Sequence, residues 1–208
     1  MRPSYRFYRF SFRVLRPIAA VLFRMKFIGR ENITDGAAMV CANHSGILDP
    51  FYVAFAFGID NHMHIIAKAE LFRMPIVSPI LKKLGMISVD RGVLDAATVK
   101  STLSYLKNGE KIVIFPEGTR VSEDDAISAK AGAVKIAERM SVPLVPFFLP
   151  RKKPFFSKIP LVIGKPYYLE ETDKKRNAED YALLAEELME KIKSLNPMRN
   201  EQREDFSR

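Results

Sequence analysis

Residues 112–120 read Ile-Val-Ile-Phe-Pro-Glu-Gly-Thr-Arg, and this stretch indicates how the chain folds. Its first four residues are an apolar run of the kind that forms a short buried strand. Pro116 then ends the hydrogen-bonding ladder of that strand, and Gly118 allows the backbone of the following turn to approach a ligand closely. Arg120 offers a planar guanidinium group that suits phosphate. We interpret the stretch as a strand that delivers a polar turn to the end of a sheet.

Similar apolar runs recur along the chain and alternate with segments of helical periodicity. The predicted strands cover residues 37–42, 64–67, 86–89, 112–115, 144–149 and 161–164, and the predicted helices cover residues 50–57, 75–84, 94–108, 129–140 and 181–195. Strands that alternate with helices predict an α/β fold. We expect a single layered domain with a mixed, mostly parallel sheet flanked by helices.

A second polar segment, Cys41-Ala-Asn-His-Ser-Gly-Ile-Leu-Asp-Pro50, lies between a predicted strand and a predicted helix. His44 is a candidate general base because its ordinary pKa lies near neutrality. On one regular helix His44 and Asp49 would lie about 140° apart. With His44 in a loop, however, the Asp49 carboxylate can hold one imidazole nitrogen while the other accepts a proton. The alternatives are a helix-capping role for Asp49 and a structural role for His44.

Residues 85–91 repeat the plan of residues 112–120, with a short strand that delivers Arg91 at its end. Arg91 and Arg120 could therefore converge on one phosphate group. The alternative for each arginine taken singly is an ion pair on the surface.

Together these segments resemble the 1-acylglycerol-3-phosphate acyltransferase family of glycerolipid acyltransferases, which has four ordered sequence blocks. The first block, Asn-His-x4-Asp, matches residues 43–49, and the second ends at Arg91. The third, Phe-Pro-Glu-Gly-Thr-Arg, is unaltered at residues 115–120, and the fourth, Val-Pro-x-x-Pro, matches residues 142–146. Residues 67–72 also resemble the stretch that commonly separates the first two blocks in this family.

The resemblance implies that the chain transfers a fatty acyl group from a thioester to the free hydroxyl of 1-acylglycerol-3-phosphate, forming phosphatidate. His44, oriented by Asp49, would take the proton from the hydroxyl, and nearby backbone N–H groups would stabilise the oxyanion. The expected substrate-binding residues are Asn43, Lys68, Arg91, Glu117, Gly118, Thr119 and Arg120. The resemblance implies no cofactor, and the co-substrate would be a thioester of coenzyme A or of acyl carrier protein.

Other chemistries fit the sequence less well. It contains no Gly-x-Ser-x-Gly nucleophile motif, and Cys41 lies inside an apolar run, where a buried thiol is expected. His62 and His64 would face the same way on a strand, but no cluster of acidic residues or cysteines lies near them in the sequence. We therefore expect no metal site. Two alternative functions stay open: acylation of another lysophospholipid or of glycerol-3-phosphate, and a non-catalytic lipid-binding module.

The net charge of +9 is concentrated at the N-terminus. Residues 1–30 contain eight basic side chains and no acidic one, which leaves +1 for the other 178 residues. A nucleic-acid-binding domain usually distributes basic residues over its folded body, so we expect no nucleic-acid partner. The asymmetry instead indicates that the N-terminal segment meets an anionic surface.

Residues 2–24 are predicted to form an amphipathic helix that lies on a membrane surface. Six arginines fall within a stripe about 80° wide, and aromatic and aliphatic side chains cover most of the remainder. Pro17 is expected to kink or split the helix. Within this N-terminal segment the longest apolar run, residues 17–23, is shorter than the roughly 20 residues that a membrane-spanning helix needs. The alternative is a helix that packs on the domain with its arginines in solvent.

These observations divide the chain into a basic membrane-surface arm at residues 1–30, an acyltransferase domain at residues 31–196 and a flexible tail at residues 197–208. The expected location is the cytoplasmic face of a membrane, with peripheral or monotopic attachment through the arm.

Overall fold

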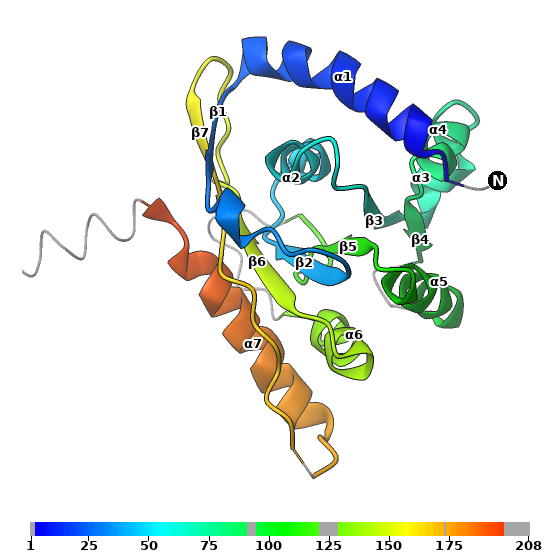
Figure 1. The fold of residues 1–208 in the computed structure, drawn as a ribbon, viewed down its shortest axis with the longest axis vertical. Helices are drawn as coiled ribbons and strands as arrows, with labels where there is room; N and C mark the ends of the chain where they lie inside the picture. Colours follow the sequence, from blue (N-terminus) through cyan, green and yellow to red (C-terminus); the bar gives the residue numbers. More distant parts are fainter. Residues whose placement is uncertain (1–2, 91–94, 121–128, 173, 198–208) are drawn as a thin grey trace, which may run out of the picture.

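The computed structural model describes residues 3–90, 95–120, 129–172 and 174–197. Seven strands form one sheet in the order β1-β7-β6-β2-β5-β3-β4 (Figure 1). Neighbouring strands are parallel except for the antiparallel pair β6 and β7, which confirms the predicted mixed, mostly parallel sheet. The strands are β1 (Arg24–Ile28), β2 (Ala38–Ala42), β3 (Met63–Lys68), β4 (Ile87–Val89), β5 (Lys111–Ile114), β6 (Leu144–Phe148) and β7 (Lys158–Ile163).

Helices cover both faces of the sheet, as an α/β fold requires. Helix α2 lies on one face, and α5, α6 and α7 lie on the other (Figure 1). The helices are α1 (Tyr5–Leu22), α2 (Asp49–Phe57), α3 (Ala69–Arg73), α4 (Val77–Lys83), α5 (Ala96–Lys107), α6 (Gly132–Met140) and α7 (Ala178–Ser194), with a 3₁₀ turn η1 (Arg30–Asn32). Five of them match predicted helices, whereas α1 matches the predicted arm and α3 was not predicted.

The central strand β2 explains why the sequence shows continuous apolar runs instead of alternation. All five of its residues are buried. Val40 packs in the core under α2, whereas Met39 and Cys41 pack in the core formed with α5, α6 and α7. A strand that is covered on both faces needs apolar side chains at every position.

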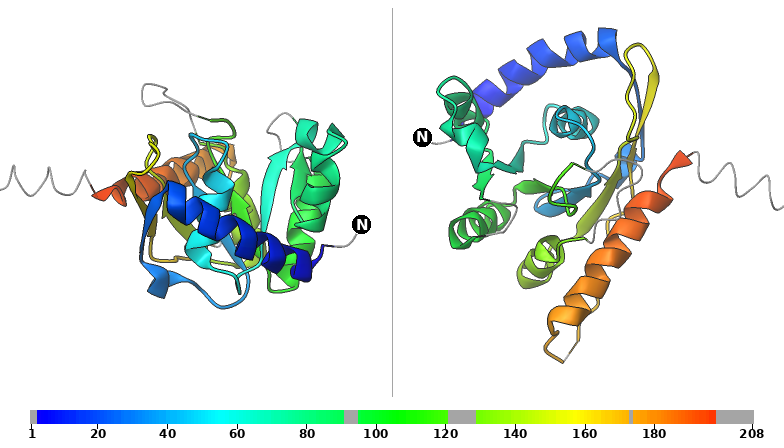
Figure 2. Two further views of the ribbon diagram at one scale, coloured as in Figure 1. Left: turned by 90° about the horizontal axis from the view of Figure 1, so that it is seen from above. Right: turned by 180° about the vertical axis from the view of Figure 1, so that it is seen from behind.

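Helix α1 bridges the molecule above α2 (Figures 1 and 2). At its start, Ser4 N donates to Lys83 O at the end of α4 (2.8 Å). At its end, Phe156 N donates to Leu22 O (2.6 Å), which ties α1 to the loop before β7. The helix runs through Pro17 without interruption, so the predicted split does not occur.

One side of α1 packs on the domain and the other side is exposed. Tyr8 and Phe12 are buried against Phe55 of α2, and the Tyr8 hydroxyl donates to Asn61 O (3.0 Å). Phe10 and Ile18, by contrast, are more than half exposed. No helix in the described ranges is long and apolar enough to cross a membrane.

Strand β1 is a departure from the sequence prediction, because its residues were expected to belong to the arm. It pairs with β7, a strand more than 130 residues later, in the register Arg24 to Lys158. Met25 and Phe27 pack against the core, whereas Arg24 and Lys26 are exposed. A segment of five residues is too short for its periodicity to separate a strand from a helix end. Residues 198–208 of the predicted tail lie outside the described residues.

Candidate active site

The candidate active site lies where three parallel strands end side by side. Strands β5, β2 and β6 are neighbours and run in the same direction, so the segments after them meet at one edge of the sheet. These segments are the loop at residues 43–48, the turn at residues 115–120 and the stretch at residues 149–153. The first and third sequence blocks therefore converge with the segment that follows the strand of the fourth block, as expected at the carboxyl ends of parallel strands.

His44 and Asp49 form the pair that the sequence predicted. The loop after β2 folds back so that His44 Nδ1 lies 2.9 Å from Asp49 Oδ2, although Asp49 is already in α2. The same oxygen accepts hydrogen bonds from the backbone N–H groups of Ser45 and Gly46, each at 2.7 Å. Asp49 thus holds the imidazole ring and also closes the loop that carries it. The Nε2 atom is the ring nitrogen that remains for chemistry.

The Asp49 carboxylate is fully buried and is held in its ionised form by its neighbours. Burial is the largest single influence on Asp49 and raises its pKa, but the hydrogen bond to His44, the positive charge of Lys153 and the Gly46 and Ser45 N–H groups together lower it by more. The net pKa lies below the ordinary value. Lys153 Nζ lies 3.0 Å from Asp49 Oδ1 and is itself nearly buried.

The third sequence block holds His44 from the other side. The imidazole ring stacks on Phe115, with ring centroids 4.2 Å apart. The backbone N–H of His44 donates to Glu117 Oε2 (2.6 Å), and Glu117 Oε1 accepts from Arg151 (2.9 Å). Glu117 is buried, so the His44 N–H and the Arg151 guanidinium replace the water that would otherwise solvate its carboxylate. This residue was predicted to contact substrate, and in the structure it fixes the backbone at His44.

Asn43 also has a framework role in the structure. Its Nδ2 donates to Leu149 O (2.7 Å) and its Oδ1 accepts from Leu149 N (2.8 Å). Asn43 is buried, and these two bonds join the end of β2 to the end of β6. The structure therefore shows the predicted substrate ligand Asn43 supporting the loop of His44.

Four of the other predicted binding residues lie at the same edge of the sheet. Gly118 has a left-handed backbone (φ +68°), and a Cβ atom there would lie 2.6 Å from Lys130 Cε, so glycine lets that side chain cross the turn. Thr119 and Arg120 follow on the turn and are exposed, and Lys68 is exposed at the end of β3. Arg91 lies outside the described residues.

Two residues of the site, Arg151 and Lys153, were missed by the sequence analysis. Both lie in the segment that follows β6, within the basic run Arg151-Lys-Lys153. The signal was present, because a basic run directly after a buried parallel strand reaches the same edge as the other blocks. Cys41, by contrast, is fully buried in β2, and burial raises the pKa of its thiol, so the predicted buried role is confirmed.

Comparison with known proteins identifies the family of this chain. The family described as Acyltransferase matches residues 24–149, from β1 through the end of β6. The chain is also 33% identical over 195 residues to the 1-acyl-sn-glycerol-3-phosphate acyltransferase of Bacillus subtilis (strain 168), covering 90% of this chain and 96% of that protein. The chain belongs to this acyltransferase family.

Two further matches extend the comparison to a more distant relative and to a solved structure. This acyltransferase is 33% identical over 159 residues to the 1-acyl-sn-glycerol-3-phosphate acyltransferase of Borreliella burgdorferi, covering 72% of this chain and 62% of that protein. The crystal structure of the 1-acyl-sn-glycerophosphate acyltransferase PlsC from Thermotoga maritima has a TM-score of 0.62 at 23% identity, covering 94% of this chain and 78% of that chain. The latter match shows a shared fold.

Proposed function

We propose that this acyltransferase moves a fatty acyl group from a thioester to the free hydroxyl of 1-acylglycerol-3-phosphate, forming phosphatidate. The observation that carries the proposal is the pairing of His44 with a buried, ionised Asp49 at the edge of the sheet. The names of its relatives support the choice of acceptor. A non-catalytic lipid-binding module would have no use for this pair or for the Lys153 charge behind it.

In the proposed mechanism His44 acts as the general base. Its Nε2 takes the proton of the acceptor hydroxyl as that oxygen attacks the thioester carbonyl. The carbon–sulfur bond then breaks, and the proton passes from the imidazolium to the departing thiolate. Asp49 holds Nδ1–H and stabilises the imidazolium while it exists. No covalent acyl-enzyme is needed, because the hydroxyl attacks the thioester directly.

The backbone geometry limits where oxyanion donors can come from. The N–H groups of His44, Ser45 and Gly46 all donate to carboxylates, so they are engaged within the loop. We assign oxyanion stabilisation to the turn at residues 117–120 instead, except for the Gly118 N–H, which donates to Phe115 O (2.9 Å). We also assign the acceptor phosphate to Arg120 on that turn and to Arg91, with Lys68 as a further cation at the same edge.

We assign membrane attachment to α1 and to apolar side chains beside the catalytic loop. The exposed face of α1 carries large apolar residues, and Ile47 and Leu48 are exposed within the loop that carries His44. Large apolar side chains that are exposed together on one surface indicate that this surface contacts a membrane or another apolar partner. The arm proper is α1, because residues 24–28 form β1. Attachment would be peripheral or monotopic, on the cytoplasmic face where the thioester donors are found.

The test is an assay with purified protein, anionic vesicles and a panel of acceptors. The panel contains 1-acylglycerol-3-phosphate, glycerol-3-phosphate and 1-acylglycerophosphocholine, each with palmitoyl-coenzyme A and with palmitoyl-acyl carrier protein. The proposal predicts that phosphatidate is the major product with at least one donor. Acylation of a different acceptor at a higher kcat/KM would replace the assigned substrate, and failure with every pair would contradict acyl transfer.

A further inference from the structure

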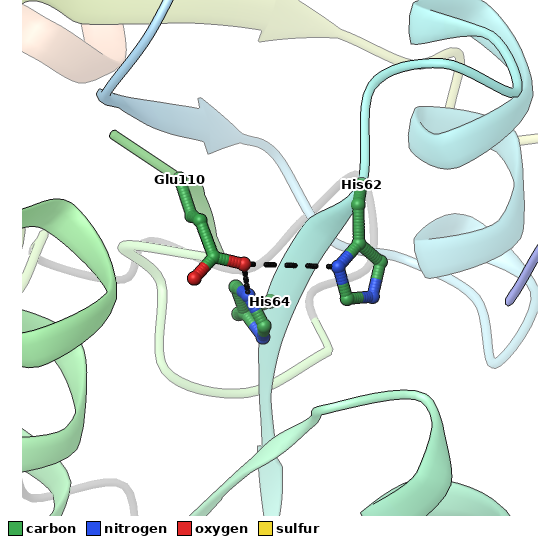
Figure 3. Close-up of side chains that lie close together, drawn as sticks. All are labelled: His62, His64 and Glu110. Atoms are coloured by element: carbon green, nitrogen blue, oxygen red, sulfur yellow. Dashed lines mark hydrogen bonds and ion pairs between the residues drawn. The ribbon is translucent and has the colours of Figure 1, made fainter. Parts of the chain in front are cut away.

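His62, His64 and Glu110 come together in the structure (Figure 3), at the edge of the sheet opposite to His44 and Asp49. His62 precedes β3, His64 lies within it, and Glu110 precedes β5. These are the amino ends of two parallel strands, whereas His44 follows the carboxyl end of β2. The sequence predicted no metal site, because no acidic cluster lies near the two histidines. The fold supplies the missing carboxylate from a position 46 residues after His64.

Backbone carbonyls fix which nitrogen of each ring faces Glu110. His64 Nδ1 lies 2.7 Å from Gly85 O, and His62 Nε2 lies 3.1 Å from Leu84 O. A carbonyl oxygen can only accept, so both nitrogens carry a hydrogen, and in a neutral ring the other nitrogen bears a lone pair. A metal-binding histidine is oriented in the same way, with its second nitrogen donating to a carbonyl or carboxylate.

The three remaining atoms converge although none of them has a hydrogen to donate in the neutral rings. Glu110 Oε2 lies 2.6 Å from His64 Nε2 and 3.8 Å from His62 Nδ1, and all three potential ligand atoms lie within 4.8 Å of one another. Two lone pairs and a carboxylate repel one another at such distances, so either a proton on His64 Nε2 or a metal ion must lie among them.

One side of the cluster is buried in the protein, and the other side faces a surface cavity. His64 is fully buried and its ring stacks on Tyr105, whereas the Glu110 side chain is about one third exposed. Glu110 and His62 line a cavity of about 370 Å³ that is also lined by Asp35, Asp60 and Lys111. An ion and a water molecule can therefore enter from this cavity, which has more acidic than basic side chains.

We propose that His62 Nδ1, His64 Nε2 and Glu110 bind one divalent transition-metal ion, with zinc as the best match, and that water from the cavity completes a tetrahedral shell. Two histidines and a glutamate are a known zinc ligand set. The present 2.6 Å between Glu110 and His64 is shorter than the roughly 3.4 Å between two ligands on zinc, so Glu110 must swing outward. Its partial exposure permits this movement.

The site is placed to hold α1 on the domain. The ring of His62 packs against Tyr5 and Tyr8 of α1, with ring centroids 5.6 and 4.7 Å apart. Tyr8 also donates to Asn61 O next to His62. A bound ion would fix the His62 ring and so the surface on which the arm rests. The role is therefore structural and lies apart from the acyl-transfer chemistry.

The test is zinc titration of the full-length chain, expressed without a histidine tag and treated with chelator. Calorimetry should show one site per chain, and Co²⁺ should give the strong visible absorption of a tetrahedral ion. Glu110→Gln and His62→Gln should each weaken zinc binding at least 100-fold, because each removes a direct ligand. His44→Ala is the matched control, since the chain has only three histidines, and it should bind zinc like the wild type.

Several outcomes would overturn the proposal. They are an absence of zinc binding by the wild-type chain, unchanged binding by both ligand variants, and loss of binding in His44→Ala, which would place the ion in the catalytic site. If the wild-type chain does not bind zinc, a proton between His64 Nε2 and Glu110 accounts for their contact instead. Thermal unfolding of the wild-type chain is an independent measurement if a variant fails to fold: Zn²⁺ should raise the Tm and Mg²⁺ should not.

Discussion

Lys153 Nζ lies 3.0 Å from Asp49 Oδ1, while Asp49 Oδ2 lies 2.9 Å from His44 Nδ1. One buried carboxylate is therefore held from both ends, by the Lys153 ammonium group and by the imidazole that we propose as the general base. Lysine at this position keeps the carboxylate ionised without competing for the oxygen that orients the ring. This arrangement links the segment after β6 to the first sequence block.

Replacing Lys153 by methionine should destabilise the protein in a pH-dependent way. At pH 7 the loss should be about 3 kcal/mol, because the buried Asp49 charge would lack its ionic partner. The native pKa of Asp49 is lowered, so its contribution is present above the ordinary carboxyl pKa and is lost as pH falls through the native value. The difference between the two proteins should therefore shrink below about pH 4.

Urea unfolding followed by circular dichroism between pH 7 and pH 3 measures this difference. Lys152→Met is the matched control, since it removes the same charge from an exposed neighbouring position. A penalty for Lys153→Met that is constant across this range, or equal to that of the control, would show that Lys153 does not stabilise the Asp49 carboxylate.

Asp49→Asn should separate catalysis from substrate binding. The amide is neutral and cannot stabilise an imidazolium, and its NH₂ group has to face either the Ser45 and Gly46 N–H donors or the Lys153 ammonium group, which disturbs the support of the ring. We expect kcat to fall by about 10³-fold while KM for the acceptor changes little. Steady-state kinetics on vesicles measure both quantities. A kcat within tenfold of the wild-type value would remove Asp49 from the mechanism.

The Glu117–Arg151 ion pair should support the His44 loop cooperatively. Glu117→Gln leaves Arg151 without its carboxylate, and Arg151→Met leaves the buried Glu117 charge without its cation. Each change should cost about 2–4 kcal/mol of unfolding free energy and also lower kcat. The double variant should lose less than the sum, with a coupling energy of about 1–3 kcal/mol. Additive losses would mean that the two side chains act independently.

The exposed arginines of α1 should govern binding to anionic vesicles. Arg6, Arg13 and Arg16 are exposed on the helix, and each is worth roughly 1 kcal/mol near an anionic leaflet. Changing all three to glutamine should weaken partitioning by about 100-fold at low salt. Flotation with phosphatidylglycerol vesicles measures this partitioning, and the effect should shrink as salt rises.

The matched control changes three exposed lysines away from α1, namely Lys100, Lys107 and Lys175, to glutamine. It removes the same net charge from a different surface. Equal losses of vesicle binding in the two triple variants would show that total charge, and not α1, directs attachment.

Local sequence patterns were sufficient to predict most of the sheet. Apolar runs such as residues 38–42 lie in strands that are buried on both faces, so composition alone marks them. Strand β1 was missed because Arg24-Met-Lys-Phe-Ile28 alternates over only five residues and becomes a strand only through its pairing with β7. The interruption predicted at Pro17 does not occur in α1, whose ends are anchored by hydrogen bonds to Lys83 and Phe156.

In the site, too, contacts between residues close in sequence were predicted, whereas contacts between distant segments were not. His44 and Asp49 are five residues apart, so the loop between them was enough to predict their contact. Lys153 reaches Asp49 only because β6 lies beside β2, and Glu110 reaches His64 only because β5 lies beside β3. No spacing in the sequence encodes these neighbours, since the order of strands in the sheet differs from their order in the chain.

The central claim is that His44 is the general base for acyl transfer to 1-acylglycerol-3-phosphate. The most direct measurement compares phosphatidate formation by the wild-type chain and by His44→Ala on vesicles, with binding of the acceptor measured in parallel. We predict that the variant still binds 1-acylglycerol-3-phosphate but loses at least 10³-fold in kcat, because a positioned base supplies about 10²–10⁴-fold and loss of the ring also disrupts the site. Phosphatidate formation by His44→Ala within tenfold of the wild-type rate would contradict the account.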